Sequence, residues 1–207
     1  ANPASIAIAD LDLDGKPDLA VSNLFNATLS VFRNGSISGS IAFGDRFDIS
    51  VGSQPFSLAA GFLDDDNRPD IIVGNRGDSN LSIFFNTSLT GSISFGLASN
   101  VSVNSNPRSV AIGDLDLDGQ TDIAVATESG MVSLLRNTIT SPGVASFDLS
   151  SVSAGSMPYS VAIGDLNGDG KPELSVANRN SNNVSYFENN SSTGSLTFSH
   201  MADVATG

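Results

Sequence analysis

A fourfold internal repeat is the feature that most constrains the fold of this 207-residue chain. Four prolines, Pro3, Pro55, Pro107 and Pro158, stand 52, 52 and 51 residues apart, and similar segments follow each of them. The third apolar segment of each repeat leads to an asparagine, and these are Asn34, Asn86, Asn137 and Asn189. The repeats divide the chain into units 1–52, 53–104, 105–155 and 156–207, which together form a single repeat domain.

Each unit is predicted to contain four short strands. In the first unit they are expected near residues 5–9, 19–23, 28–33 and 46–51, where apolar or β-branched segments are bounded by Gly, Asn, Asp and Ser. No segment has an apolar stripe with a 3.6-residue period, so no helix is expected. Four-stranded units of about 40–50 residues are typical of β-propeller blades. We therefore predict an all-β protein, a β-propeller with four four-stranded blades, rather than a stack of short β-solenoid coils.

Acidic nine-residue loops follow the first predicted strand of each unit. Oxygen-bearing side chains at positions one, three, five and nine, with a glycine at position six, can converge on one cation, and position seven would add its backbone carbonyl. Positions one, three, five, seven and nine are Asp10, Asp12, Asp14, Lys16 and Asp18 in the first unit, Asp114, Asp116, Asp118, Gln120 and Asp122 in the third, and Asp165, Asn167, Asp169, Lys171 and Glu173 in the fourth. An EF-hand is excluded because its position twelve requires a Glu, and valine stands there in all three loops.

The second unit departs from this pattern. Phe62 replaces the first acidic residue, and Asn67 replaces the turn glycine. The remaining candidate ligands are Asp64, Asp66, Arg68 and Asp70, with Arg68 at the carbonyl position. We expect three strong calcium sites, in units one, three and four, and a weak or empty site at residues 64–70.

The distribution of charge supports a metal. The chain has 22 acidic and 9 basic residues, a net charge of −13. The four loops hold 15 of the acidic residues when Asp65 is included, so the other 7 are balanced by the 9 basic ones. Carboxylates confined to nine residues repel one another unless a cation neutralises them. The alternative is a set of solvated acidic turns, because Asp and Gly are ordinary turn residues.

Composition excludes several classes of function. The negative charge argues against nucleic acid and anionic membrane surfaces, which both require Lys and Arg. The chain has no Cys and one His, His200, so zinc sites built on these residues and thiol catalysis are excluded. No apolar run approaches the ~20 residues of a membrane span, so no membrane insertion is expected. No nucleophile–base pair stands outside the acidic loops, and we therefore expect a protein that is not an enzyme.

These residues resemble the FG-GAP/VCBS repeat family of integrin α-subunit propellers and bacterial surface proteins. The acidic loop after an Ala-rich strand is similar to the calcium motif of that family, and Phe43-Gly44 and Phe95-Gly96 resemble its Phe-Gly element. Units three and four have Phe147-Asp148 and Phe198-Ser199 instead, and Leu13 and Leu117 stand where the family often has glycine. The resemblance implies a propeller with calcium between the first two strands of each blade. It leaves adhesion, sugar binding and scaffolding open as functions.

The combined interpretation is a non-catalytic, calcium-binding β-propeller module of an extracellular protein, secreted or at the cell surface. Its ligand, a protein or glycan, is expected on the face opposite the calcium loops, where Ala4, Phe56, Arg108 and Tyr159 follow the aligned prolines. The alternatives are a carbohydrate-binding lectin and a non-catalytic domain of a polysaccharide-degrading enzyme. Arg76-Gly77-Asp78 spells an integrin-recognition tripeptide on the same face. Four blades are not expected to close a ring alone, so self-association or further blades would complete a seven- or eight-bladed ring.

Overall fold

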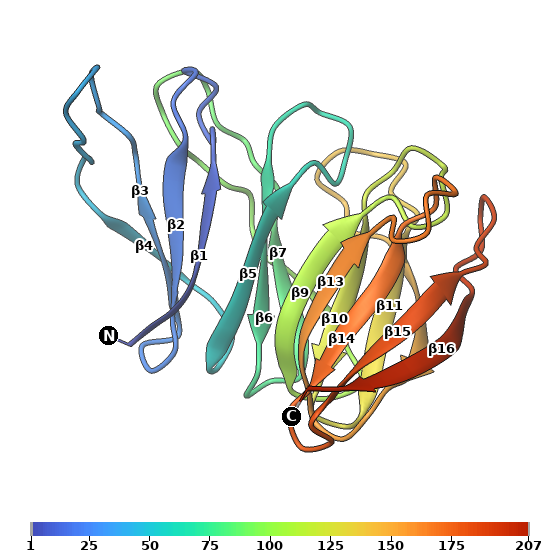
Figure 1. Ribbon diagram of the computed structural model, residues 1–207. Coiled ribbons are helices and arrows are strands. Elements are labelled where there is room, and N and C mark those ends of the chain that lie inside the picture. The colour runs from blue at the N-terminus through green and yellow to red at the C-terminus, as the bar shows by residue number, and fades with distance from the viewer. Residues whose placement is uncertain (1, 207) are drawn as a thin grey trace.

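The computed structural model describes residues 2–206 and contains four antiparallel sheets of four strands (Figure 1). In each sheet, every strand pairs with the next strand along the chain. The strands are β1 Pro3–Ala9, β2 Asp18–Asn23, β3 Thr28–Phe32, β4 Phe47–Ser50, β5 Pro55–Gly61, β6 Asp70–Asn75, β7 Asn80–Phe84, β8 Ser99–Ser102, β9 Pro107–Gly113, β10 Asp122–Thr127, β11 Met131–Asn137, β12 Phe147–Ser153, β13 Pro158–Gly164, β14 Glu173–Asn178, β15 Asn183–Asn189 and β16 Phe198–Ala205. The predicted all-β class is confirmed, and the strands of the first unit lie within two residues of their expected bounds.

The part of the chain that the structure describes contains no helix. Accordingly, no helix among residues 2–206 is long and apolar enough to cross a membrane.

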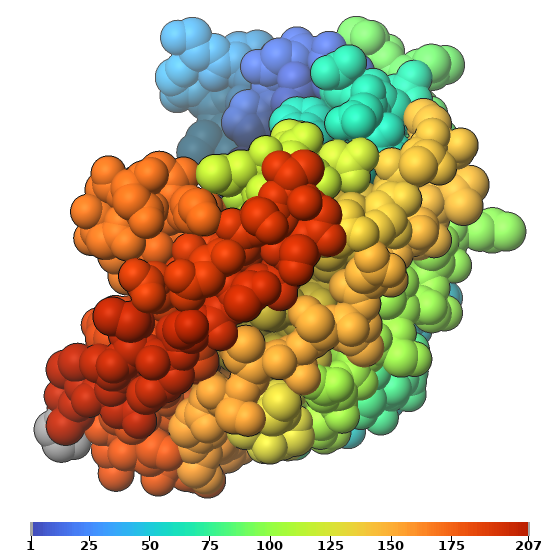
Figure 2. Space-filling model, turned by 90° about the vertical axis from the view of Figure 1, so that its right-hand side faces the viewer, coloured from blue at the N-terminus to red at the C-terminus, as the bar shows by residue number. Residues whose placement is uncertain are grey.

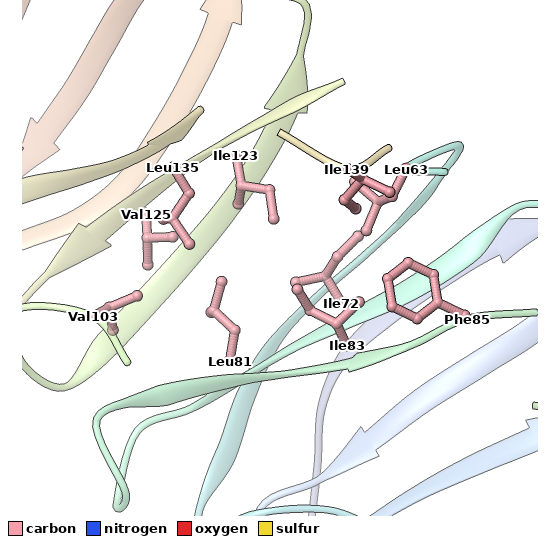
Figure 3. Packing of buried hydrophobic residues seen from close by; sticks show 10 residues of the cluster. All are labelled: Leu63, Ile72, Leu81, Ile83, Phe85, Val103, Ile123, Val125, Leu135 and Ile139. Carbon is pink, nitrogen blue, oxygen red and sulfur yellow. The ribbon is translucent and has the colours of Figure 1, made fainter. Parts of the chain in front are cut away.

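Consecutive sheets pack face to face through three hydrophobic clusters. The cluster between the second and third sheets is shown in Figure 3, where Leu81 and Ile72 of one sheet face Val125 and Ile123 of the other. A second cluster joins the first sheet to the second, and a third joins the third sheet to the fourth. None of these three clusters joins the first sheet to the fourth. The sheets therefore follow one another as blades, in chain order, with the first and the last at the two ends (Figure 1).

Small residues at the ends of the innermost strands allow the blades to approach closely. A Cβ atom added to Gly61 would overlap Ile112 of the next blade, and one added to Gly113 would lie 3.2 Å from Ile163 Cγ2. The alternation of bulky and small residues in the first strand of each unit thus places a large side chain of one blade against a glycine of the preceding blade.

A repeated asparagine side chain connects each blade to the preceding one. Asn86 Nδ2 donates to the carbonyl oxygen of Leu11 at 2.9 Å, and Asn137 and Asn189 donate in the same way to Leu63 and Leu115 at 2.8 and 2.9 Å. Each asparagine also donates to its own blade, as Asn86 does to Pro69 O at 2.9 Å. These buried side chains are the asparagines that mark the repeat in the sequence.

The first strand of every sheet runs toward the same edge of the molecule, which is the upper edge in Figure 1. The acidic loops therefore lie together on that face, as the alternating strand directions predict. The hairpins between the third and fourth strands share this face, because Gly143 N donates to Asp64 at 2.7 Å and Gly194 N donates to Asp116 at 2.7 Å. The connections between blades lie on the opposite face.

Replacing one cross-blade asparagine should destabilise the protein. In Asn86→Ala the buried carbonyls of Leu11 and Pro69 lose their donor, and an unsatisfied buried polar group costs about 1–3 kcal/mol. We expect the free energy of unfolding, measured by urea denaturation, to fall by about that amount. Asn190→Ala is the matched control, because Asn190 is exposed and its side chain makes no cross-blade bond. We call this cross-blade asparagine hydrogen bond a clamp. Equal losses of unfolding free energy in the two variants would contradict its stabilising role.

Candidate metal centre

The loops of the first and third units have the same internal geometry. The carboxylate of Asp10 accepts the N–H groups of Asp14 and Gly15 at 3.1 and 2.9 Å, and Asp114 accepts those of Asp118 and Gly119 at the same distances. Positions three and five accept backbone N–H groups two residues further on, as Asp118 does from Gln120 at 2.8 Å. These bonds curl each loop around its own carboxylates.

The carboxylate at position nine closes the loop and is buried. Asp18 accepts Leu11 N at 2.9 Å and Asn34 N at 2.7 Å, and Asp70 and Asp122 make the equivalent bonds. Burial raises the pKa of Asp70 to about 7 and that of Asp122 to about 6, although the backbone N–H groups favour the charged form. The pKa of Asp18 is raised for the same reason. A cation beside these groups would favour their ionised form.

Three carboxylates converge in each of these two loops. Asp10, Asp12 and Asp18 in the first, and Asp114, Asp116 and Asp118 in the third, each offer one oxygen within 4.8 Å of the others. At position seven, the backbone N–H groups of Lys16 and Gln120 are used within the loop, and the Gln120 side chain turns away to bond Ile139 O at 3.3 Å.

The fourth loop keeps the turn with a longer acid at its end, but among the described residues Asn189 N does not donate to Glu173 as Asn137 N does to Asp122. Asp165 accepts Gly168 N and Gly170 N at 2.7 and 3.0 Å, and the backbone N–H of Lys171 donates to Asp169 at 2.8 Å. Glu173 accepts Leu166 N at 2.8 Å and also accepts Asn167 Nδ2 at 3.4 Å. The Lys171 ammonium points away from the loop, because it donates to Ser191 O at 2.8 Å.

The second loop keeps the turn but loses part of the ligand set. Asp70 accepts Leu63 N at 2.9 Å, and Asp66 accepts Arg68 N at 2.8 Å. The Arg68 guanidinium pairs with Asp66 at 3.1 Å, so it offsets part of the loop's charge. Phe62 at position one is exposed and offers no oxygen. The weak or empty site expected at this loop stays a prediction.

An arginine that the sequence did not indicate pairs with the carboxylates of the first loop. Arg33, near the end of β3, pairs through Nε with Asp12 and through Nη2 with Asp14 at 2.6 Å. In the third unit the equivalent Arg136 pairs with Asp148 on the neighbouring strand instead. The first loop therefore holds an internal cation that competes with a metal, whereas no arginine is paired with the third loop among the described residues. In the sequence, the only indication of this role was that a basic residue stands one position before the repeated asparagine.

The donor set of these loops suits calcium. All candidate side chains offer oxygen, and Ca²⁺ takes 6–8 oxygen ligands in flexible geometry. Magnesium requires near-ideal octahedral geometry and is less suited to ligands spread along one irregular loop. The residues that would hold the ion are those at positions one, three, five and nine, with the carbonyl of position seven.

The opposite face carries a column of arginine and aromatic side chains. Phe56 and Tyr159 meet edge to face at a centroid distance of 6.0 Å, and the Arg108 guanidinium lies 4.6 and 5.1 Å from their ring centroids. Arg179 lies 5.6 Å from the Tyr159 ring centroid. Three residues that follow aligned prolines in different blades are thus brought together.

Glu128 anchors this column. It accepts Arg108 Nε and, at 2.7 Å, Arg76 Nε. Burial raises the pKa of Glu128, but the hydrogen bond from Arg76 and the charge of Arg108 outweigh it, and the pKa is lower than usual. Arg76 is therefore held within the protein, and Asp78 likewise accepts Ser53 N at 2.7 Å. Both charged ends of the Arg76-Gly77-Asp78 tripeptide have internal partners.

Comparison with protein families identifies the repeats. The FG-GAP-like repeat matches residues 10–73, 63–125 and 114–176, and the FG-GAP repeat matches residues 157–197. The chain therefore belongs to the FG-GAP repeat family, and the resemblance noted in the sequence is confirmed. No curated protein sequence matches the chain.

Several solved structures share the fold. A proposed 6-phosphogluconolactonase of Bacteroides fragilis matches with a TM-score of 0.66 and 18% identity over 98% of this chain and 55% of its own. A Lactobacillus plantarum protein matches at 0.63 and 19%, over 99% and 57%. BBS1N, in its complex with ARL6DN, matches at 0.56 and 17%, over 94% and 50%. At these identities the likeness concerns the fold alone, and the chain spans about half the length of each structure.

Leu117 holds a backbone conformation that favours glycine. Its φ is +59°, as Leu13 has +56°, while the fourth loop has Gly168 at +82°. The left-handed conformation costs a residue with a Cβ about 1–2 kcal/mol. We expect Leu117→Gly to raise the free energy of unfolding by about 1 kcal/mol in chemical denaturation, because the side chain is half exposed and its loss removes little packing. Leu117→Ala, which keeps the Cβ, should not raise the free energy of unfolding. An increase equal to that of Leu117→Gly would show that the backbone of Leu117 is not strained.

Removing Arg33 should strengthen calcium binding at the first loop. In Arg33→Gln the carboxylates of Asp12 and Asp14 lose a competing cation. A partly exposed ion pair is worth up to about 1 kcal/mol, so the affinity should rise about twofold to fivefold. Calorimetric titration of calcium measures this change. Arg46→Gln removes the same charge from an exposed pair with Asp48 and should leave the affinity unchanged; an equal rise would point to net charge alone.

Proposed function

We propose that the chain is a calcium-stabilised, non-catalytic β-propeller module that serves as a ligand-binding scaffold outside the cell. One observation carries this proposal: the acidic loops of the first and third blades share one pattern of backbone bonds, and each brings three carboxylate oxygens within 4.8 Å of one another. Turns that are only solvated have no reason to repeat this arrangement in phase with the blades.

Calcium would supply positive charge, and the residues of the loop connect its site to the strands and to the next blade. The loop joins the innermost strand of a blade to the second strand, and its ninth residue is tied to the end of the third strand, as Asp122 is to Asn137. Position three also reaches the next blade, since Asp116 accepts Gly194 N. Neutralising these carboxylates would therefore stabilise both the blade and its contact with the following blade.

An extracellular location fits this role. Calcium sites of modest affinity, about 10⁻⁴–10⁻³ M, are sufficient outside cells, where the ion is abundant. The chain has no Cys, so calcium would take the part that disulfides play in other secreted proteins. The ligand surface would be the face opposite the loops, around Phe56, Arg108 and Tyr159.

Carbohydrate binding is the second candidate function. The observation that favours it is the Tyr159 ring on this face, with the exposed Arg179 guanidinium beside it. An aromatic face and a charged donor are groups that bind sugars bearing a carboxylate. A glycan array probed with the purified chain separates this function from protein binding.

Removing calcium should destabilise the fold. Without the ion the clustered carboxylates repel, and a ligand that binds only the native state stabilises it by mass action. We expect a chelator to lower the melting temperature in scanning calorimetry, and calcium to restore it more fully than magnesium. Asp118→Asn should weaken this response because it alters one ligand of the third loop. Asp45→Asn, which removes an exposed acid outside the loops, should leave the response intact. A melting temperature insensitive to chelation would refute the proposal.

A further inference from the structure

Several positions of the chain place an Asp or Asn directly before a glycine, and such pairs can rearrange without an enzyme. These pairs are Asp14-Gly15, Asn34-Gly35, Asp118-Gly119, Asn167-Gly168 and Asp169-Gly170. The backbone nitrogen of the glycine can attack the side-chain carbonyl carbon of the residue before it, because glycine has no side chain to obstruct the approach. Which pair reacts in the folded protein depends on how firmly the structure holds both groups.

The structure protects Asn34-Gly35, although an amide is displaced more readily than a carboxylate in an unfolded chain. Gly35 N donates to Ala42 O at 2.9 Å, so the attacking nitrogen is held in a hairpin. The Asn34 side chain accepts Ser36 N at 2.8 Å and donates to Pro17 O at 2.7 Å, and the residue is only 9% exposed. We therefore expect this pair to persist while the protein is folded.

Asp118-Gly119, in the third acidic loop, is more accessible. Asp118 is partly exposed, and a Cβ atom built on Gly119 would meet no atom of residues 2–206 within 4 Å, so a ring formed here has room. The loop lies between two blades that the chain itself supplies. In Figure 2 its yellow-green atoms reach the surface between the cyan atoms of the second blade and the orange and red atoms of the fourth. Its accessibility therefore does not depend on where the sequence ends.

The third loop gathers carboxylates without an ion pair. Asp114, Asp116 and Asp118 bring oxygens within 4.8 Å of one another, and these groups repel when all are charged. Among the described residues, no basic side chain pairs with them. Gly119 N donates to Asp114 at 2.9 Å, and Asp118 accepts Gln120 N at 2.8 Å. These two bonds hold the reacting groups apart only while the loop keeps its shape.

The first loop has the same pair and one difference. Arg33 pairs with Asp12 through Nε and with Asp14 through Nη2 at 2.6 Å, so its carboxylates are partly neutralised from within the chain. The Asp14 side chain is only 13% exposed. The protein therefore carries one acid–glycine pair with a built-in cation, Asp14-Gly15, and one without.

We propose that Asp118-Gly119 is a site of spontaneous isoaspartate formation, and that a cation bound in the third loop suppresses the reaction. Gly119 N attacks Asp118 Cγ, the nitrogen loses its proton, and one carboxyl oxygen leaves as water, which closes a succinimide ring. Water then opens the ring. Attack at the backbone carbonyl of Asp118 leaves the chain running through the former side chain. One water leaves and one enters, so no other reactant is required.

Isoaspartate would remove the third loop as a calcium site. The rearrangement adds one methylene to the backbone and moves the carboxylate at position five, so the ligands no longer converge. The suppression by calcium rests on the proposed function, because the ion would hold the Asp118 carboxylate as Arg33 holds that of Asp14. A protein that has lost calcium would then lose, with time, its ability to bind it again at this loop.

Peptide mapping of the purified 207-residue chain tests the proposal. The protein is kept for several weeks at neutral pH, below its melting temperature, with a chelator or with calcium, and electron-transfer fragmentation of its peptides locates isoaspartate. With the chelator, isoaspartate should accumulate several-fold faster at Asp118 than at Asp14, and calcium should slow it several-fold. Absence of isoaspartate at Asp118 would overturn the proposal. Equally fast deamidation of Asn34 would show that the chain had unfolded and would overturn the local mechanism.

Calorimetric titration of the fresh protein separates this inference from the proposed function. Calcium that binds the third loop without slowing isoaspartate formation would overturn the suppression. A protein that binds no calcium would refute the proposed function, and the sample with chelator would still decide whether Asp118 rearranges.

Variants test the role of the built-in cation. Arg33→Gln should raise isoaspartate at Asp14 in the chelator to the level found at Asp118, whereas Arg46→Gln, which breaks an exposed pair with Asp48, should not. Asp118→Glu keeps a carboxylate but lengthens the side chain, so it should abolish the modification at this position. Unchanged isoaspartate at Asp14 in Arg33→Gln would overturn the protection by a cation.

Discussion

The rest of the structure depends on the buried aspartate that begins the second strand in each of the first three blades. Asp122 receives one backbone N–H from the start of its own loop and another from the end of the third strand. The asparagine that supplies the second of these donors extends its side chain to the preceding blade. One acid therefore fixes the loop, the register of the sheet and the position of the clamp. Burial raises the pKa of Asp122 to about 6 and disfavours its charged form, and the two backbone N–H bonds partly offset this effect.

The packing between blades explains why negative charge is concentrated on one face. The blades pack through apolar side chains and glycines, which leave no place for charge between sheets. Fifteen of the 22 acidic residues lie in the loops at one edge, and many of their hydrogen-bond donors there are backbone N–H groups. At the opposite face Arg76 and Arg108 share Glu128, whereas Arg33 and Arg68 pair with carboxylates of the loops. The molecule thus has two chemically distinct ends.

The repeat made most of the fold predictable from the sequence. A period shared by Pro3, Pro55, Pro107 and Pro158 gave the blades, and the β-branched segments gave strands that the structure places within two residues in the first unit. Loop spacing indicated the candidate ligands, of which the structure brings together Asp10, Asp12 and Asp18 in one loop and Asp114, Asp116 and Asp118 in another. The role of Asn86 was not predictable, because its partner Leu11 is 75 residues away and only packing brings them together. Arg33 was missed for a similar reason: its pairing with Asp12, rather than with a strand neighbour as for Arg136, depends on side-chain direction.

The cross-blade asparagines all reach in one direction along the chain. Asn86 donates to the carbonyl of Leu11, Asn137 to that of Leu63 and Asn189 to that of Leu115. The acceptor of each of these bonds is therefore synthesised before its donor. Because the chain is synthesised from its N-terminus, each blade leaves the ribosome after the neighbour that carries its acceptor. The polarity of one side-chain contact thus matches the order of translation.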